Sequence, residues 1–235
     1  KVKMCGISKV ETIPAIVDAK PDYMGLVFAP SKRQVTVDQA KTLVEELHKQ
    51  YAKTYGTNMV PMNAVATQDT NGFGEENISS EAIKTVGVFV NETLDNLVTI
   101  AKEVNLDAVQ LHGDEDEAFI QALKEKTDVE VWKAVQIRSA VDAEAWIDSS
   151  ADMLLFDAYH KDERGGTGEV FDWSCLDEFE RPFMLAGGID STNVARAIRT
   201  VRPYGIDISS GIETDGVKDD EKIKAFTNIV RTIAH

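Results

Sequence analysis

Eight short apolar segments recur along the chain, and each is followed by a turn and a stretch in which apolar residues have helical spacing. The segments are Val2–Ile7, Tyr23–Phe28, Thr85–Val90, Ala108–Leu111, Glu130–Val135, Met153–Asp157, Phe183–Ala186 and Gly205–Ser209. Several are almost uninterrupted apolar runs, which is the pattern of parallel strands buried on both faces. Strands that alternate with helices predict a parallel α/β fold, and the number eight favours a single (β/α)8 TIM barrel.

Helical periodicity is clearest in three segments, where apolar residues lie three and four positions apart. These segments are Val37–His48, Leu94–Val104 and Asp219–Ala234. Ser191 is the expected N-cap of a further helix over Asn193–Arg199. The 235 residues are close to the roughly 250 of one such barrel. We therefore expect one domain over residues 1–235.

One segment interrupts this alternation. Between about Tyr51 and Ser80 the chain is polar and rich in turn-forming residues, and a loop of that length is uncommon in a compact domain. Because the segment follows helix 2 and precedes strand 3, we expect a surface insertion over residues 51–80 on the amino-terminal side of the barrel. Catalytic loops belong to the opposite side. A role as a lid or in partner binding stays open.

Charge and cysteine content narrow the class of function. The 40 acidic residues against 25 basic ones give a net charge of -15, which repels nucleic-acid phosphates and anionic membranes. We expect no nucleic acid and no membrane as a partner, and we find no long uncharged apolar run or export leader. The two cysteines, Cys5 and Cys175, have no metal-ligand spacing and form no disulfide framework, which predicts a reducing, cytoplasmic location.

Polar side chains stand at the predicted carboxyl ends of the strands, the side on which a barrel binds its substrate. Strand one ends at Cys5, strand four in Gln110 and His112, and strand six at Asp157. Two interpretations of Cys5 are open here: a small side chain packed in the core, the usual fate of a strand cysteine, or a reactive thiol. Asp157 is either a functional carboxylate or the cap of the following turn.

The segments after strands seven and eight are rich in glycine and serine. Gly187 and Gly188 follow strand seven and Gly211 follows strand eight, so backbone N–H groups there are free to approach an oxyanion. Ser209 and Ser210 add hydroxyl donors. We expect these residues to bind phosphate, although the same glycines also suit tight turns alone.

Taken in order, the motifs resemble the phosphoribosylanthranilate isomerase family. The resemblance runs through "KMCGI", "GLVFAPSKRQV", "VGVFVN", "VQLHG", "LLFD" with "GGTGEVFDW", "LAGGI" and "DISSGIE", and covers nearly the whole chain except the insertion. It implies a TIM barrel that carries out an Amadori rearrangement of an aminoaldose phosphate in tryptophan biosynthesis. It implies neither a cofactor nor a metal, and the sequence has no Walker loop and no Rossmann fingerprint after a strand.

The resemblance also implies a catalytic pair. Asp157 would be the general acid that protonates the sugar ring oxygen, and Cys5 the general base that takes a proton from the neighbouring sugar carbon. Asp157 must then hold a proton at neutral pH, although the pKa of a free aspartic acid is about 3.9. Cys5 must act through a lowered pKa or through its minority thiolate, starting from a pKa of about 8.5.

Three substrate-binding residues follow from the same resemblance. Arg33 matches the arginine on the anthranilate side, where a planar fork suits a carboxylate or an aryl ring; a solvated loop arginine is the alternative. Asp207 would accept a hydrogen bond from the aryl amine, or bond to neighbouring backbone instead. His112 is expected to line the site together with Gln110, without an assigned proton transfer; a lone histidine before a glycine is as often structural.

Some alternatives remain open at this stage. The loop "AYHKDERGGTGEVFDW" has glycines for a hinge over the substrate, and His160, Lys161 and Arg164 to hold the anion. The related isomerase of histidine biosynthesis has aspartate where Cys5 stands, and the second phosphate cradle it needs is not evident here. A non-catalytic barrel that only binds a phosphorylated ligand or a partner is the alternative of a different class. A monomer and a homodimer both suit the sequence.

Overall fold

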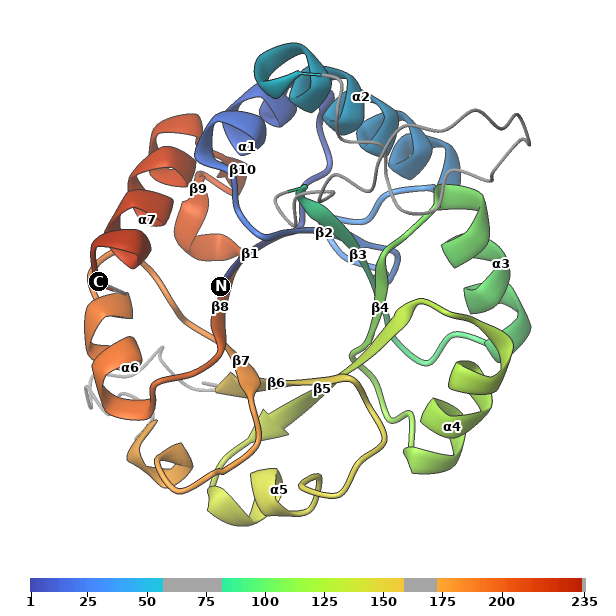
Figure 1. The fold of residues 1–235 in the computed structure, drawn as a ribbon, viewed down its shortest axis with the longest axis vertical. Coiled ribbons are helices and arrows are strands. Elements are labelled where there is room, and N and C mark those ends of the chain that lie inside the picture. The colour runs from blue at the N-terminus through green and yellow to red at the C-terminus, as the bar shows by residue number, and fades with distance from the viewer. Residues whose placement is uncertain (57–81, 159–172, 234–235) are drawn as a thin grey trace, which may run out of the picture.

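The chain folds as a closed ring of eight parallel strands, shown in the computed structural model of Figure 1. The structure describes residues 1–56, 82–158 and 173–233. The barrel strands are β1 Val2–Cys5, β2 Tyr23–Val27, β3 Lys84–Phe89, β4 Ala108–Leu111, β5 Glu130–Ile137, β6 Met153–Ala158, β7 Phe183–Ala186 and β8 Gly205–Ile208. Each strand pairs with the next, and β1 closes the ring by pairing with β8. The predicted (β/α)8 barrel is confirmed.

Helices cover the outside of the ring (Figure 1). They are α1 Ile13–Ala19, α2 Val37–Tyr55, α3 Leu94–Val104, α4 Glu117–Lys126, α5 Ala140–Glu144, α6 Val194–Val201 and α7 Asp220–Ile233. The described residues also form the 3-10 turns η1 Val10–Thr12, η2 Trp173–Leu176 and η3 Ser210–Ile212, and a small antiparallel ribbon of β9 Glu213–Thr214 and β10 Val217–Lys218. The last helix, α7, packs against the first, α1, so the layer of helices forms a closed ring around the strands.

Side chains along each strand point alternately into the ring and outward beneath the helices, so they form two packed layers. The apolar side chains that pack together inside the ring are Tyr23, Val86, Ala108, Trp132, Ala134, Leu155, Met184 and Ala186. Their neighbours along each strand point outward and pack beneath the helices. Because both faces of the strands are buried, the sequence shows nearly continuous apolar runs instead of a clean alternation.

Three aspartates make the same bond at the amino-terminal end of the barrel. Asp22, Asp107 and Asp152 each stand directly before an even-numbered strand. Each accepts a hydrogen bond from a backbone N–H at the start of the preceding strand, over 2.8, 2.7 and 2.8 Å respectively. These carboxylates therefore satisfy donors that the strand ladder leaves unpaired.

Helix α2 is longer than the sequence pattern predicts. A capping box starts it, with Thr36 Oγ1 accepting from the Gln39 N–H and Gln39 Oε1 accepting from the Thr36 N–H. The helix continues beyond the predicted end at His48, because Tyr51 is buried and extends the apolar stripe. The start of the predicted insertion is therefore helical, and residues 57–81 lie outside the described residues.

Helix α6 begins later than predicted, and Ser191 is not its cap. Asn193 is the N-cap residue, and Ser191 is exposed. The Asp190 carboxylate takes the role expected of a serine hydroxyl, since its Oδ1 accepts from the N–H groups of Thr192 and Asn193. Asn193 Nδ2 in turn donates to the Gly188 carbonyl at 2.7 Å, which ties the start of the helix to the loop after β7.

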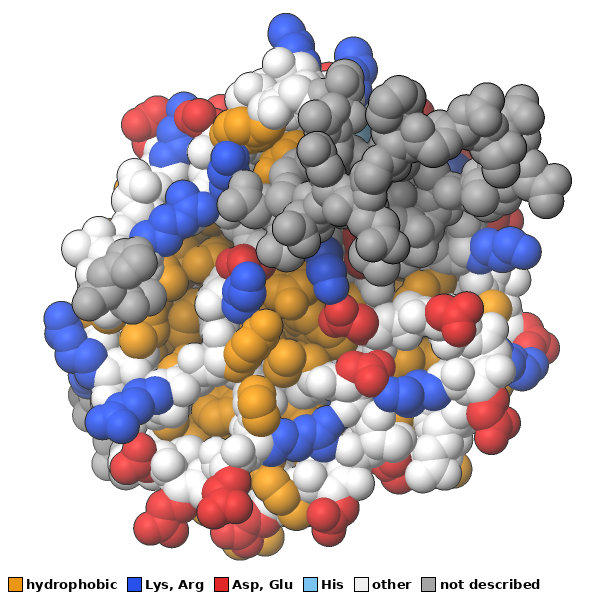
Figure 2. Space-filling model, viewed as in Figure 1, with side chains coloured by type: hydrophobic (Ala, Val, Ile, Leu, Met, Phe, Trp, Pro, Cys, Tyr) orange, Lys and Arg blue, Asp and Glu red, His pale blue; other side chains and the backbone are white. Residues whose placement is uncertain are grey.

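On the face shown in Figure 2, apolar side chains gather over the strand ring, and charged side chains of both signs lie around them. Exposed large apolar side chains, such as Val141 and Val217, lie apart from one another in the chain. Within the described ranges, no helix combines the length and the apolar character that crossing a membrane requires.

Candidate active site

Cys5 is the last residue of β1, and its side chain faces the inside of the barrel at 8% exposure. The neighbouring strand has Gly25 at this level, where a Cβ would lie 2.8 Å from Cys5 Sγ, so the glycine leaves room for the sulfur. Strand β1 ends earlier than predicted because Gly6 has a φ of 79°. The N–H groups of Gly6 and Ile7 both bond the Gly25 carbonyl.

A buried ion pair lies one layer below Cys5. Lys3 is two residues earlier on the same side of β1, is fully buried, and has its Nζ 2.9 Å from Asp207 Oδ2. The two residues are register partners of β1 and β8. The other carboxylate oxygen, Asp207 Oδ1, is buried without a hydrogen-bond partner among the described residues. Asp207 thus has one unused acceptor, which in a buried carboxylate calls for an explanation.

Burial dominates the electrostatics of Cys5. Loss of hydration raises the pKa of the Cys5 thiol above its ordinary value, and the Asp207 carboxylate also raises it, whereas the ammonium groups of Lys3 and Lys218 lower it. Burial alone would lower the pKa of Lys3, but Asp207 and Cys5 raise it above its ordinary value. Burial therefore favours the neutral form of the Cys5 thiol, whereas the pairing with Asp207 favours the charged form of Lys3.

Asp157 lies on the inner side of β6 and ends next to His112. Its side chain is 24% exposed, so it is reachable from solvent, unlike the apolar residues of the ring. His112 Nε2 lies 3.4 Å from Asp157 Oδ2, and Gln110 Nε2 lies 2.8 Å from His112 Nδ1. Gln110 Nε2 is a donor, so it pairs with the His112 tautomer in which Nδ1 accepts; in that tautomer the Nε2–H is directed at Asp157.

Gly187, directly after β7, packs against this carboxyl group. It has a φ of 88°, and a Cβ there would lie 2.6 Å from Asp157 Oδ1 and 2.4 Å from the Ala158 carbonyl oxygen. A side chain at this position would therefore strain the backbone and displace the Asp157 carboxylate.

The residues predicted to bind phosphate lie in two neighbouring loops, since β7 pairs with β8. Gly187 and Gly188 follow β7, and Ser209 follows β8, with Ser210 and Gly211 in η3. The Ser209 hydroxyl donates to the Cys5 carbonyl at 3.1 Å, so it links this loop to β1. Phosphate binding by this group stays a prediction.

Arg33 makes a two-point ion pair with Glu213, a residue outside the predicted set. Arg33 Nε and Nη2 donate to Glu213 Oε1 and Oε2, at 2.6 and 3.0 Å. Lys32 and Lys218 bond the same carboxylate at 3.1 and 3.0 Å. Burial opposes ionisation, but the bonds from these three cations lower the pKa of Glu213 to about 2.

Three residues of this region escaped the sequence interpretation: Lys3, Glu213 and Lys218. One signal was available, because Lys3 interrupts an apolar strand in "KVKMC". A charge inside a buried strand needs a partner, so its presence predicts a buried ion pair without naming the acid. Lys218 had no such signal, since it reaches Glu213 through the turn between β9 and β10.

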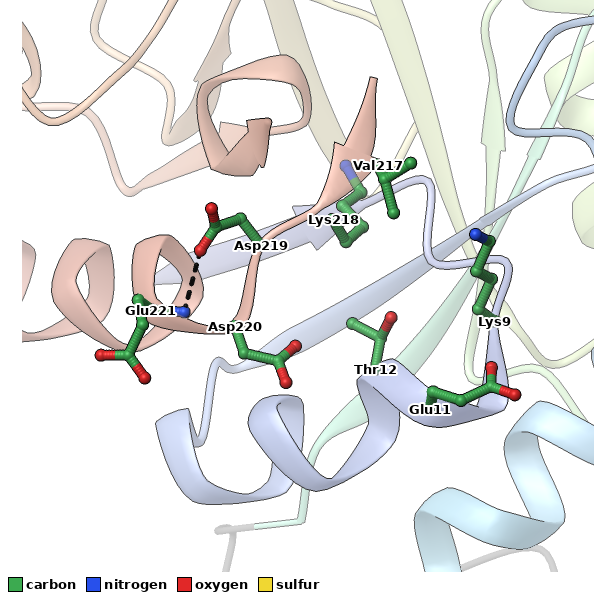
Figure 3. Close-up of a pocket in the computed structure, with 8 residues that line it drawn as sticks. All are labelled: Lys9, Glu11, Thr12, Val217, Lys218, Asp219, Asp220 and Glu221. Carbon is green, nitrogen blue, oxygen red and sulfur yellow. Dashed lines mark hydrogen bonds between the residues drawn. The ribbon is translucent and has the colours of Figure 1, made fainter. Parts of the chain in front are cut away.

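A surface pocket adjoins the cluster around Glu213, between the start of α1 and the β10–α7 corner (Figure 3). It is lined by Lys9, Glu11, Thr12, Val217, Lys218, Asp219, Asp220 and Glu221. Asp219 Oδ1 accepts from the Glu221 N–H at 3.0 Å, the dashed line of Figure 3. Carboxylates outnumber ammonium groups in this lining, which disfavours an anionic ligand.

The expectation that the loop after β6 helps to hold the anion is not tested by the structure. His160, Lys161 and Arg164 of the loop after β6 lie outside the described residues. Among the residues that the structure describes, no group of three or more His, Cys, Asp or Glu side chains is arranged to hold a metal ion. The polar side chains that do gather stand at the carboxyl ends of the strands. With the fold, they define an enzyme of the TIM-barrel class.

Comparison with known proteins identifies the family. The sequence model described as N-(5'phosphoribosyl)anthranilate (PRA) isomerase matches residues 61–229. N-(5'-phosphoribosyl)anthranilate isomerase of Thermoanaerobacter sp. (strain X514) is 41% identical over 235 residues, which cover 99% of this chain and 98% of the relative. The chain therefore belongs to the N-(5'-phosphoribosyl)anthranilate isomerase family, the isomerases of tryptophan biosynthesis.

Solved structures agree with this assignment. The crystal structure of phosphoribosyl anthranilate isomerase from Thermotoga maritima matches with a TM-score of 0.76 at 31% identity, over 99% of this chain and 98% of that one. A structure of the enzyme in complex with reduced 1-(o-carboxyphenylamino)-1-deoxyribulose 5-phosphate matches with a TM-score of 0.74 at 30% identity, with the same coverage. The ligand of that relative is a phosphorylated small molecule, as the sequence predicts for this chain.

Proposed function

We propose that Cys5 and Asp157 carry out the Amadori rearrangement of phosphoribosylanthranilate at the carboxyl-terminal mouth of this barrel. The observation that supports this most is their placement: both are inward-facing residues at the carboxyl ends of strands, β1 and β6, of one closed ring. Their surroundings differ, since one is a buried thiol and the other a partly exposed carboxyl group beside an imidazole. An acid and a base that act on one substrate need such unlike environments.

Asp157 opens the sugar ring. Its carboxyl group donates a proton to the ring oxygen, the C1–O bond breaks, and the aryl amine nitrogen supplies its electron pair to C1. The result is an open-chain hydroxyl group and an iminium ion. His112, with its Nε2 3.4 Å from Asp157 Oδ2, is placed to orient the carboxyl group during this step.

Cys5 then acts as the base. Its thiolate takes the proton from C2, the C–H electron pair forms a C1=C2 double bond, and the iminium nitrogen becomes a neutral amine. The enolamine ketonises when the C2 hydroxyl group loses its proton and C1 gains one. The substrate's own nitrogen accepts the electrons, so these residue roles need no added electron sink.

Asp207 and Arg33 recognise the anthranilate half of the substrate. The buried Asp207 Oδ1 is an unused acceptor below Cys5, which suits the N–H of the aryl amine. Arg33 commits Nε and Nη2 to Glu213, and Nη1 stands outside that pair. Nη1 is therefore the donor that we assign to the anthranilate carboxylate.

The phosphate binds between the loops after β7 and β8. Gly187 and Gly188 have no side chains that would block the backbone N–H groups of the loop after β7. Ser210 and Gly211 begin the turn in the neighbouring loop after β8, the strand that pairs with β7. Short hydrogen bonds from such loops hold an oxyanion despite a net charge of -15, because salt screens the distant carboxylates.

Turnover of phosphoribosylanthranilate, made in situ and followed optically, tests the pair. Cys5→Ala and Asp157→Asn should each lower kcat by about 100-fold or more, the usual contribution of a general acid or base. Cys175→Ala is the matched control, since it removes the other thiol, on η2, and should keep wild-type turnover. Wild-type turnover by Cys5→Ala would return Cys5 to a packing role, and no turnover by the unmodified chain would reject the proposed activity.

A further inference from the structure

The base step creates an electrostatic difficulty at Cys5. A thiolate is the nucleophilic and basic form of cysteine, yet this sulfur lies at the buried end of β1, where a charge is costly. A partner of opposite charge within reach of the sulfur would offset that cost. The question is which of the cations near the mouth fills this role.

Lys3 is the cation that belongs to the same buried layer. It is two residues before Cys5 on one strand, so both side chains point into the barrel, and it is 0% exposed. An ammonium group has three N–H donors. Asp207 Oδ2 takes one at 2.9 Å, and Cys5 is the next residue along the same inner face of β1.

The other charged groups near Cys5 are already committed elsewhere. Lys218, from β10, donates to the Ser209 carbonyl and to Glu213 Oε1, so a carboxylate offsets its charge. Arg33, from the loop after β2, is held by the same Glu213. Asp207, from β8, is negative and disfavours a thiolate. Lys3 is thus the cation that shares the buried inner face of β1 with the sulfur, and its charge lowers the pKa of Cys5.

We propose that Lys3 is a positioning residue that stabilises the thiolate of Cys5, with Asp207 holding the Lys3 ammonium group in place beneath the sulfur. The proposal rests on the proposed function, in which the thiolate takes the C2 proton. It gives the buried lysine a role beyond bracing β1 against β8. A lysine that only braced the two strands would leave the ionisation of the thiol unaffected.

The reactivity of Cys5 toward iodoacetamide measures this directly, because only the thiolate is alkylated. We would follow alkylation against pH by peptide mass spectrometry in a Cys175→Ala background, with and without Lys3→Met. In the Lys3→Met variant we expect the alkylation profile to move to higher pH by about one unit or more, a roughly tenfold slower reaction at pH 7.5. The acidic limb of kcat/KM should move with it, while KM changes little.

Lys3→Met leaves a buried carboxylate unpaired, so a second variant guards against misfolding. Lys3→Met/Asp207→Asn removes both charges, and its alkylation profile should still lie at higher pH than that of the parent, because the Lys3 charge lowers the pKa of Cys5 by more than the Asp207 charge raises it. Lys3→Arg, which keeps a cation, should shift the profile less. A folded Lys3→Met or double variant with the parent profile would overturn the proposal.

The two proposals fail separately. Alkylation reports on the sulfur whether or not it is the base. If Cys5→Ala keeps turnover while Lys3→Met slows alkylation, then the catalytic assignment fails and the role of Lys3 stands. If Cys5→Ala abolishes turnover but Lys3→Met has the same alkylation profile as the parent, only the proposed role of Lys3 fails.

Discussion

Arg33 and Glu213 are joined by two parallel hydrogen bonds, from Nε and Nη2 of the guanidinium to the two carboxylate oxygens. They lie 180 residues apart in the sequence, one after β2 and the other after η3. The pair therefore fixes the arginine that we assign to the substrate carboxylate against the loop that follows β8. Planar two-point bonds of this kind set direction as well as energy.

Loss of Glu213 should destabilise the barrel markedly. The side chains of Glu213 and Lys218 are 5% and 6% exposed, so Glu213→Gln leaves a buried ammonium without its counter-charge. We expect the free energy of unfolding in urea to fall by about 3 kcal/mol, as when one partner of a buried pair is removed. Lys32→Ala is the control on the same carboxylate: its side chain is 56% exposed, and its loss should cost under about 1 kcal/mol. Equal costs would contradict the buried-pair interpretation.

The stabilising contribution of the Glu213 carboxylate should be lost at acidic pH. The pKa of Glu213 is lowered to about 2 in the folded chain, from an ordinary value of 4.5. Its stabilising contribution is therefore complete above about pH 4.5 and is lost as pH falls toward 2. The difference in unfolding free energy between wild type and Glu213→Gln should shrink between pH 5 and pH 3. A difference that stays constant over this range would show that the charge of Glu213 is not what stabilises the fold.

Sequence pattern was sufficient for the ring but not for the ion pairs inside it. Ala108–Leu111 and Phe183–Ala186 were predicted with their observed bounds, because local apolar runs report burial directly. Lys3–Asp207 depends instead on the register of β1 against β8, which joins residues 204 positions apart. No local pattern encodes which acid faces which base across a closed barrel.

Some predicted element boundaries were wrong, because they depend on local backbone conformation and capping bonds that the apolar pattern does not report. Strand β1 stops at Cys5 because Gly6 adopts a positive φ, which an apolar neighbour such as Ile7 does not reveal. At α6, a serine in the right place was less effective as a cap than the carboxylate of Asp190. The general roles of the mouth residues came from the ordered motifs, whereas their partners came only from the folded chain.

His112 should matter for the rate and not for binding. Its Nε2 faces Asp157 Oδ2, and we assign it to orienting the acid, so His112→Ala should lower kcat about tenfold, the equivalent of one lost hydrogen bond of roughly 1.4 kcal/mol. KM should stay within about a factor of two of the wild-type value if the substrate contacts lie elsewhere, as we propose. Steady-state kinetics at saturating and limiting substrate separate the two parameters. A raised KM with unchanged kcat would make His112 a binding residue instead.

Asp107 should matter for stability and not for the rate. It accepts from the backbone N–H and the hydroxyl group of Thr85, at 2.7 and 2.9 Å, at the end of the barrel opposite the mouth. Asp107→Ala should lower the free energy of unfolding by about 1 to 3 kcal/mol, because it leaves a partly buried donor unpaired. Asp148→Ala changes the net charge equally at an exposed position and should cost less than about 0.5 kcal/mol. A kcat of Asp107→Ala well below that of wild type would link this end of the barrel to catalysis.

Gly187 should prove indispensable for activity, since its lack of a side chain gives the Asp157 carboxylate its place. A Cβ would meet Asp157 Oδ1 at 2.6 Å and backbone atoms of Ala158 at 2.4 and 2.6 Å, so Gly187→Ala must move either the acid or the loop. We expect kcat to fall by about 100-fold or more, as for loss of the acid itself. Gly216→Ala is the matched control: its φ of 78° carries a similar backbone strain, but the nearest atom to its Cβ is the flexible Lys32 Nζ at 3.1 Å. That variant should lose about 1 kcal/mol of stability and keep its turnover, because strain alone does not reach the acid. If both variants lost activity to the same extent, backbone strain and not the contact with Asp157 would explain the need for glycine.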